Sequence, residues 1–97
     1  MNQSIAEVPS TRPQRPVFGR FLQYLRELGF QVENRPDGIV DCREPASDTV
    51  LLFRSRSDDD LVRDHELFLT RIQLAIHGLV AEPEFDRVMN ASFQPTT

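Results

Sequence analysis

The chain has 97 residues, 39% of them hydrophobic and 27% charged, which is typical of one globular domain and excludes a disordered chain. Its net charge of −4 argues against strong binding of nucleic acid, and no apolar run is long enough for a membrane helix. The single cysteine, Cys42, excludes an internal disulfide, and the N-terminus lacks a secretory signal, so we expect a cytoplasmic protein.

The chain begins with a polar segment that is followed by a helix. Residues 1–15 show no hydrophobic period and are interpreted as a flexible tail, and a single domain is expected over residues 16–90. Pro16 suits the first position of a helix, and Gly29 suits the left-handed position that follows a helix end. Apolar residues at helical spacing predict a helix over residues 17–28: Phe18, Phe21, Leu22, Leu25 and Leu28.

Three short strands joined by tight turns are predicted next. Pro-Asp-Gly in the first turn, and Pro-Ala-Ser-Asp in the second, are typical of chain reversals, so the strands should form an antiparallel meander. In the second strand Val40 and Cys42 should face one side of the sheet, and Asp41 and Arg43 the other. The strands are predicted over residues 30–33, 39–44 and 49–53, with turns over 35–38 and 45–48.

The C-terminal part of the chain predicts two helices. The longer one is expected over residues 65–77, with Asp64 as its N-cap and Gly78 after its last turn. A short helix over residues 82–89 and a frayed end over residues 91–97 complete the chain. The expected apolar face of the longer helix comprises Phe68, Ile72, Ala75 and Leu79, with Leu69 and Ile76 beside it.

These elements predict an α+β fold in which the two amphipathic helices cover one face of a three-stranded sheet. The other face of the sheet stays open. The third strand is apolar on both sides, so either Val50 and Leu52 or Leu51 and Phe53 should lie on that open face. An exposed apolar row on a small domain is typical of a surface that binds a partner.

Two histidines are candidates for chemistry. His65 lies between Asp64 and Glu66, and carboxylates beside an imidazole would suit a general base. The alternative for His65 is a solvated residue in the first turn of a helix. His77, at a helix end, is interpreted as structural.

Charged side chains offer two further candidates. Arg43, Arg54 and Arg56 should lie near one another and would hold phosphates or an acidic partner. The alternative is a solvated rim in which these arginines pair with the acidic triplet 58–60. This triplet lacks the spacing of a calcium loop, Cys42 is expected to be a buried thiol rather than a metal ligand or reactive thiol, and no metal or cofactor is predicted.

Several short patches resemble the HicA-type (YcfA-like) toxin family, small mRNA-cleaving proteins of bacterial toxin–antitoxin pairs. The patches lie within residues 18–90 and comprise Leu28-Gly29-Phe30, Pro36-Asp37-Gly38, Glu44 to Thr49, Arg71-Ile72-Gln73-Leu74, Gly78-Leu79 and Glu84 to Arg87. The resemblance implies a dsRNA-binding-like α-β-β-β-α fold. It also implies RNA or an antitoxin-like protein as the partner.

The sequence departs from this family at the catalytic position. The family carries its histidine in a Gly-Ser-His at the start of the second strand, where this chain has Asp37-Gly38-Ile39. Because Ile39 cannot accept a proton, we expect a HicA-like domain without RNase activity. Two alternatives stay open: an interaction or homodimerisation module that uses Val50 to Phe53, and an RNase that uses His65.

Overall fold

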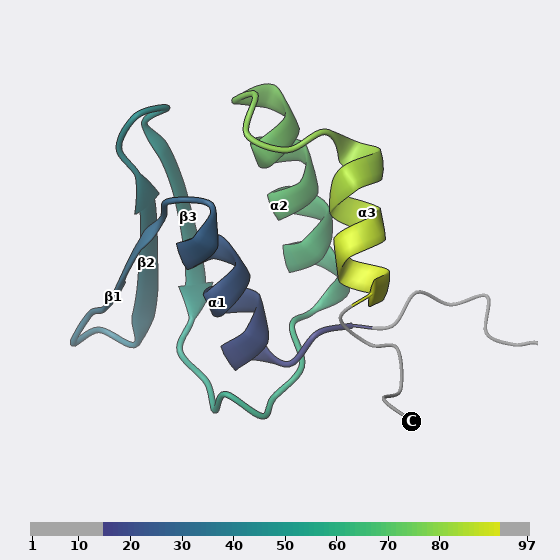
Figure 1. The fold of residues 1–97 in the computed structure, drawn as a ribbon. Coiled ribbons are helices and arrows are strands. Elements are labelled where there is room, and N and C mark those ends of the chain that lie inside the picture. Colours follow the sequence, from purple (N-terminus) through teal and green to yellow (C-terminus); the bar gives the residue numbers. More distant parts are fainter. Residues whose placement is uncertain (1–14, 92–97) are drawn as a thin grey trace, which may run out of the picture.

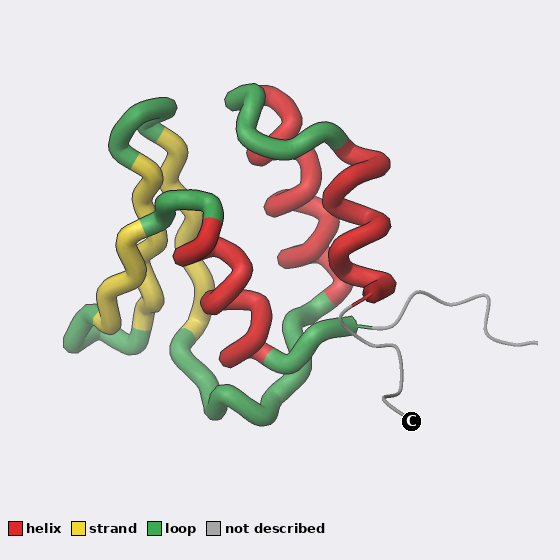
Figure 2. Tube along the Cα trace, viewed as in Figure 1, coloured by secondary structure: helices red, strands yellow, loops and turns green. Residues whose placement is uncertain are grey.

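The computed structural model describes residues 15–91, and the predicted tail over 1–15 and frayed end over 91–97 lie outside this range except for Arg15 and Ala91. The α+β class, the α-β-β-β-α order and the predicted short C-terminal helix are confirmed (Figures 1 and 2). Every helix lies within two residues of its predicted bounds. The elements are α1 (Phe18–Glu27), β1 (Gln31–Asn34), β2 (Ile39–Glu44), β3 (Thr49–Arg54), α2 (Asp64–Ile76) and α3 (Glu82–Ala91).

The three strands form the expected antiparallel sheet in the order β1-β2-β3. Val32 pairs with Cys42, and Cys42 pairs with Leu51, so that a single row crosses all three strands. Gly38, at φ 84°, and Asp48, at φ 60°, adopt the left-handed conformation that closes the two turns. Because β2 lies in the middle of the sheet, β1 and β3 are both edge strands.

All three helices lie on the same side of the sheet (Figure 1). Helices α1 and α2 cover the sheet, and α3 packs against the far side of α2, to which Arg71 joins it by ion pairs with Asp86 (2.8 Å) and Glu82 (3.3 Å). None of the helices within residues 15–91 is both long and apolar enough to span a bilayer. The core comprises Phe18, Phe21, Leu22, Leu25, Phe30, Val40, Cys42, Leu51, Phe53, Val62, Leu74, Val80, Phe85 and Met89.

The first turn of α1 is completed by the loop between β3 and α2. The backbone N–H of Phe18 donates to the carbonyl of Asp60 (2.7 Å), and that of Gly19 donates to Asp58 (3.0 Å). A side chain at Gly19 would lie only 2.9 Å from Cβ of Asp58, so the close approach of the loop requires glycine. The prediction for Pro16 was wrong by two positions, because Val17 is the N-cap and Pro16 accepts a hydrogen bond from Val62 (2.8 Å).

The predicted inner face of α2 was wrong. The buried side chains of this helix are Glu66, Thr70 and Leu74, which lie one helical turn apart, whereas Phe68 is 57% exposed. Arg63 rather than Asp64 is the N-cap. Three large apolar side chains of α2 therefore remain in contact with solvent: Phe68, Leu69 and Ile76.

The two alternatives for β3 are decided by its burial pattern. Leu51 and Phe53 point toward the helices and are buried, so they are not part of the open face. Val50 and Leu52 lie on the open face and are 42% and 55% exposed. The side chains that β3 exposes on the open face are therefore Val50 and Leu52, together with the terminal Arg54.

Candidate functional site

The outer edge of β3 presents backbone groups that no described residue binds. The N–H of Ser55 donates to Gly38 (2.9 Å) and sets the alternation of the β2–β3 ladder. By this alternation Leu51 and Phe53 direct their N–H and C=O groups toward β2. The corresponding groups of Val50 and Leu52 point outward, and within residues 15–91 their N–H groups have no acceptor. An open row of this kind is a template for another strand.

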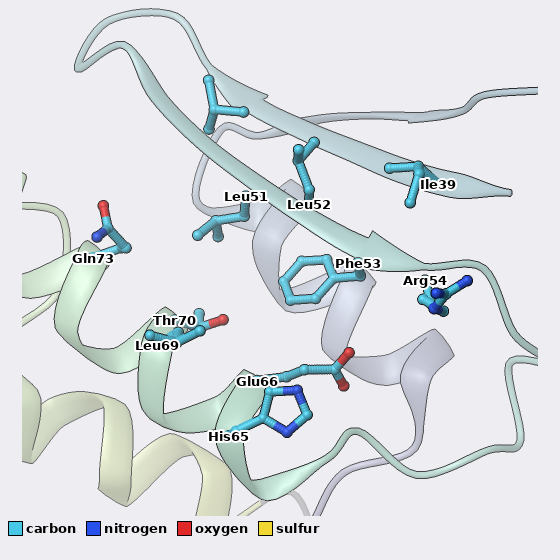
Figure 3. Close-up of a pocket in the computed structure, with 11 residues that line it drawn as sticks. Ile39, Leu51, Leu52, Phe53, Arg54, His65, Glu66, Leu69, Thr70 and Gln73 are labelled. Carbon is cyan, nitrogen blue, oxygen red and sulfur yellow. The ribbon is translucent and has the colours of Figure 1, made fainter. Parts of the chain in front are cut away.

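A groove of about 510 Å³ runs beside this edge, between β3 and α2 (Figure 3). Leu51 and Phe53 extend from the strand toward α2, as Figure 3 shows. Leu69 and Gln73 lie on the opposite wall, one helical turn apart. The groove is therefore mainly apolar, and its length follows the free edge of the strand.

One buried hydroxyl lies within the wall of this groove. Thr70 lines the groove and is fully buried, and its Oγ1 has no hydrogen-bond partner among the described residues. A buried hydroxyl without a partner costs about 1–3 kcal/mol. A polar group that entered the groove and reached this hydroxyl would remove that cost.

Exposed apolar side chains flank the edge on both sides. Val50 and Leu52 lie on the open face of the sheet, and Leu69 and Ile76 lie seven residues apart on one face of α2, at 55% and 70% exposure. We call these four residues the β3-edge patch. Together with the groove, the patch surrounds the unpaired backbone of β3 with apolar surface.

The three arginines do not form the expected group. Arg43 lies opposite Val50, and Arg54 lies opposite Ile39, so four residues, or about 13 Å along the strand, separate their positions. Arg43 also pairs with Asp41 (3.0 Å), and this hydrogen bond lowers the pKa of the Asp41 carboxyl. Within residues 15–91 the Arg54 side chain is exposed and has no ion-pair partner.

Arg56 is largely buried against Glu66, whereas both the phosphate-binding interpretation and the solvated-rim alternative expected an accessible side chain. Both of its terminal nitrogens donate to Glu66, at 2.7 and 2.6 Å, and its guanidinium lies 4.7 Å above the ring of Phe18. Burial tends to raise the pKa of Glu66, but the hydrogen bonds from Arg56 and from the backbone of Arg63 outweigh it and hold this pKa below its ordinary value. Arg56 therefore joins the loop, α1 and α2, and its partner is not the acidic triplet.

His65 lines the groove, but neither neighbouring carboxylate orients its ring. Asp64 is paired with Arg15 (3.7 Å), and Glu66 is occupied by Arg56. No hydrogen bond to the His65 ring occurs among residues 15–91. Ile39 also lines this groove. The acid–base pair that a His65 nuclease would need is thus not assembled in the described part of the chain.

His77 and Cys42 both contact other parts of the fold. His77 follows the last residue of α2, and its Nδ1 lies 3.3 Å from the carbonyl oxygen of Ser47. Cys42 is fully buried as expected, and burial raises its pKa to about 12. Within residues 15–91 no cluster of three or more His, Cys, Asp or Glu side chains is arranged to hold a metal ion.

Comparison with known proteins found no match among protein-family models, curated proteins or solved structures.

Sequence reasoning missed the α2 wall of the candidate site. Leu69, Thr70 and Gln73 form this wall, and only the excess of apolar residues around the whole of α2 signalled that one apolar face would be left over. The open edge of β3 was not predictable from this strand alone. It depends on the sheet order, which leaves β3 outermost.

Proposed function

We propose that this domain is a protein-interaction module that binds an extended segment along β3. The carrying observation is the outward-facing, unpaired backbone of Val50 and Leu52 beside an apolar groove. Added strands gain affinity from main-chain hydrogen bonds and specificity from pockets for alternate side chains. The edge provides the first and the groove provides the second.

The chemistry of the site favours a neutral, extended partner over a phosphate backbone. Two of the three candidate arginines already neutralise carboxylates of this chain, and the chain as a whole carries a charge of −4. Because a free thiol at Cys42 is compatible with a reducing compartment, the partner is expected in the cytoplasm.

The test uses peptides selected from a random phage-displayed library on the immobilised domain. The tightest peptide, titrated into ¹⁵N-labelled domain, is expected to shift the amide signals of Val50, Leu52 and Leu69. Leu52→Pro removes one outward N–H without removing a ladder hydrogen bond, and should weaken binding about tenfold or more. The matched control is Asn34→Pro, which removes an outward N–H from the other edge. Peptides that bind elsewhere, or equal affinity for both variants, would contradict the proposal.

A second candidate function is RNA binding by a HicA-like domain without nuclease activity. The α-β-β-β-α order and the unpaired Arg54 favour it. Contacts to phosphates make binding steeply salt-dependent. A short RNA duplex should therefore shift the NMR amide signals around Arg54 at low salt, and these shifts should disappear at moderate salt. The variant Arg54→Ala should abolish these shifts, and silence at low salt would remove this candidate.

A further inference from the structure

We propose that the segment added to β3 is the β3 strand of a second copy of this chain, so that two sheets join into one. This inference rests on the proposed function and specifies its partner. A two-fold axis between identical strands requires antiparallel pairing, in which outward-facing residues of one copy meet outward-facing residues of the other. The outward set of β3 comprises Val50, Leu52 and Arg54.

The charges at the two ends of β3 select one register. When Leu51 lies on the two-fold axis, Val50 lies opposite Leu52 of the second copy, and Arg54 lies beside the turn that holds Asp48, the residue before β3. Within the described residues neither Arg54 nor the Asp48 carboxylate has an ion-pair partner, although Arg43 is close enough to Asp48 to interact through its charge. The register therefore creates two intermolecular ion pairs from charges that a single copy leaves unpaired.

The same register extends the apolar surface across the axis. Val50 and Leu52 of one copy meet Leu52 and Val50 of the other on the open face, where aliphatic cross-strand pairs stabilise a sheet. On the helical side, α2 flanks the edge with Leu69 and Ile76 (Figure 3 shows Leu69 on this wall). The two-fold axis brings both α2 helices to one side of the joined sheet, so all four residues of the β3-edge patch lie at or beside the contact.

A neighbouring register is less complementary. With Leu52 on the axis, Arg54 would lie opposite Val50, and Asp48 would face Arg56, whose guanidinium is already bound to Glu66. This difference makes the inference specific enough to be tested at single positions.

Disulfide trapping tests the register directly. Residues in a hydrogen-bonded antiparallel pair have Cα atoms about 5.5 Å apart, which is a suitable distance for a disulfide. A mixture of Val50→Cys and Leu52→Cys proteins should form a covalent heterodimer upon mild oxidation, and each variant alone should cross-link far less. Cys42 is buried and should not interfere. Rapid self-cross-linking of Leu52→Cys alone would overturn the Leu51-centred register.

Sedimentation equilibrium of the full chain tests the association itself. The average mass should rise toward that of a dimer between micromolar concentrations and about 1 mM. Arg54→Asp places two like-charged pairs at the contact and should weaken the dimer about tenfold, and Asp48→Arg combined with Arg54→Asp should restore it. Leu52→Lys should also weaken the dimer, whereas Leu61→Lys, at a leucine of similar exposure (46%), should not.

The outcomes separate this inference from the proposed function. A chain that stays monomeric to about 1 mM overturns the dimer. If such a monomer still binds selected peptides through Leu52, the interaction function stands with a different partner. If it binds neither peptides nor a second copy at β3, both proposals fail.

Discussion

The two edge strands of the sheet differ in length, polarity and surroundings. β1 has four residues, of which Gln31, Glu33 and Asn34 are exposed and polar, and α1 packs near it. β3 has six residues, exposes Val50 and Leu52, and lies beside an apolar groove.

Natural proteins protect edge strands by shortness, charge or a covering segment. β1 is short and carries a charged residue, whereas in β3 only the terminal Arg54 is charged. The proposed strand addition therefore predicts pairing at β3 and not at β1.

The largest expected effect concerns the ion pair behind the β3 edge. Arg56→Ala should lower the free energy of unfolding by about 3 kcal/mol, because it leaves the nearly buried Glu66 carboxylate without its partner. The control Arg87→Ala removes an arginine that is 71% exposed and whose partner Glu84 is also exposed, so it should cost less than about 1 kcal/mol. Urea unfolding followed by circular dichroism measures both, and equal losses would show that Arg56 does not support this edge.

Lowering the pH should decrease the folding stability of the chain. The pKa values of Asp41, Glu44 and Glu66 are lowered in the folded chain, so the unfolded chain binds protons first as the pH falls. The stability that these carboxylates contribute is complete above their ordinary pKa, near about 4, and is lost as the pH drops through the folded values.

Thermal unfolding between about pH 7 and pH 3 measures this loss. In Glu66→Gln part of the dependence should disappear, because the titrating group that pairs with Arg56 is absent. A melting temperature that is constant over this range would contradict the assignment.

The smallest expected effect distinguishes an interaction residue from a core residue. Leu52→Ser, measured at high dilution, should change the free energy of unfolding by less than about 0.5 kcal/mol, because this side chain is mostly exposed. Gln31→Ser is the matched change on β1. A loss above about 1 kcal/mol would mean that Leu52 stabilises the single copy and is not reserved for a partner.

The sequence contained enough information to predict the elements and the antiparallel sheet. The helical period of α1, the Pro-Asp-Gly turn and the positive-φ glycines at 29, 38 and 78 are local signals, and each lies where it was predicted. The local pattern failed for α2, where apolar residues surround the helix. Its inner face includes Glu66 only because Arg56 neutralises this carboxylate.

The candidate site depended on contacts that are distant in the sequence. Arg56 resembles a surface arginine until its partner ten residues later is known. Val50 and Leu51 are equally apolar, and only packing against the helices decides which of them is exposed. Periodicity alone therefore predicted that β3 is apolar on both sides, but it did not predict which side is exposed to solvent.

The hydrogen bonds that begin α1 also affect the order in which the chain can fold. Helix α1 is the first of the described elements to be synthesised, yet its first N–H groups bind carbonyls of Asp58 and Asp60, which are made only after the whole sheet. A helix of ten residues is only marginally stable by itself in water. During synthesis the first turn of α1 should consequently remain frayed until the loop after β3 has left the ribosome. The helix that is synthesised first is then one of the last to become stable.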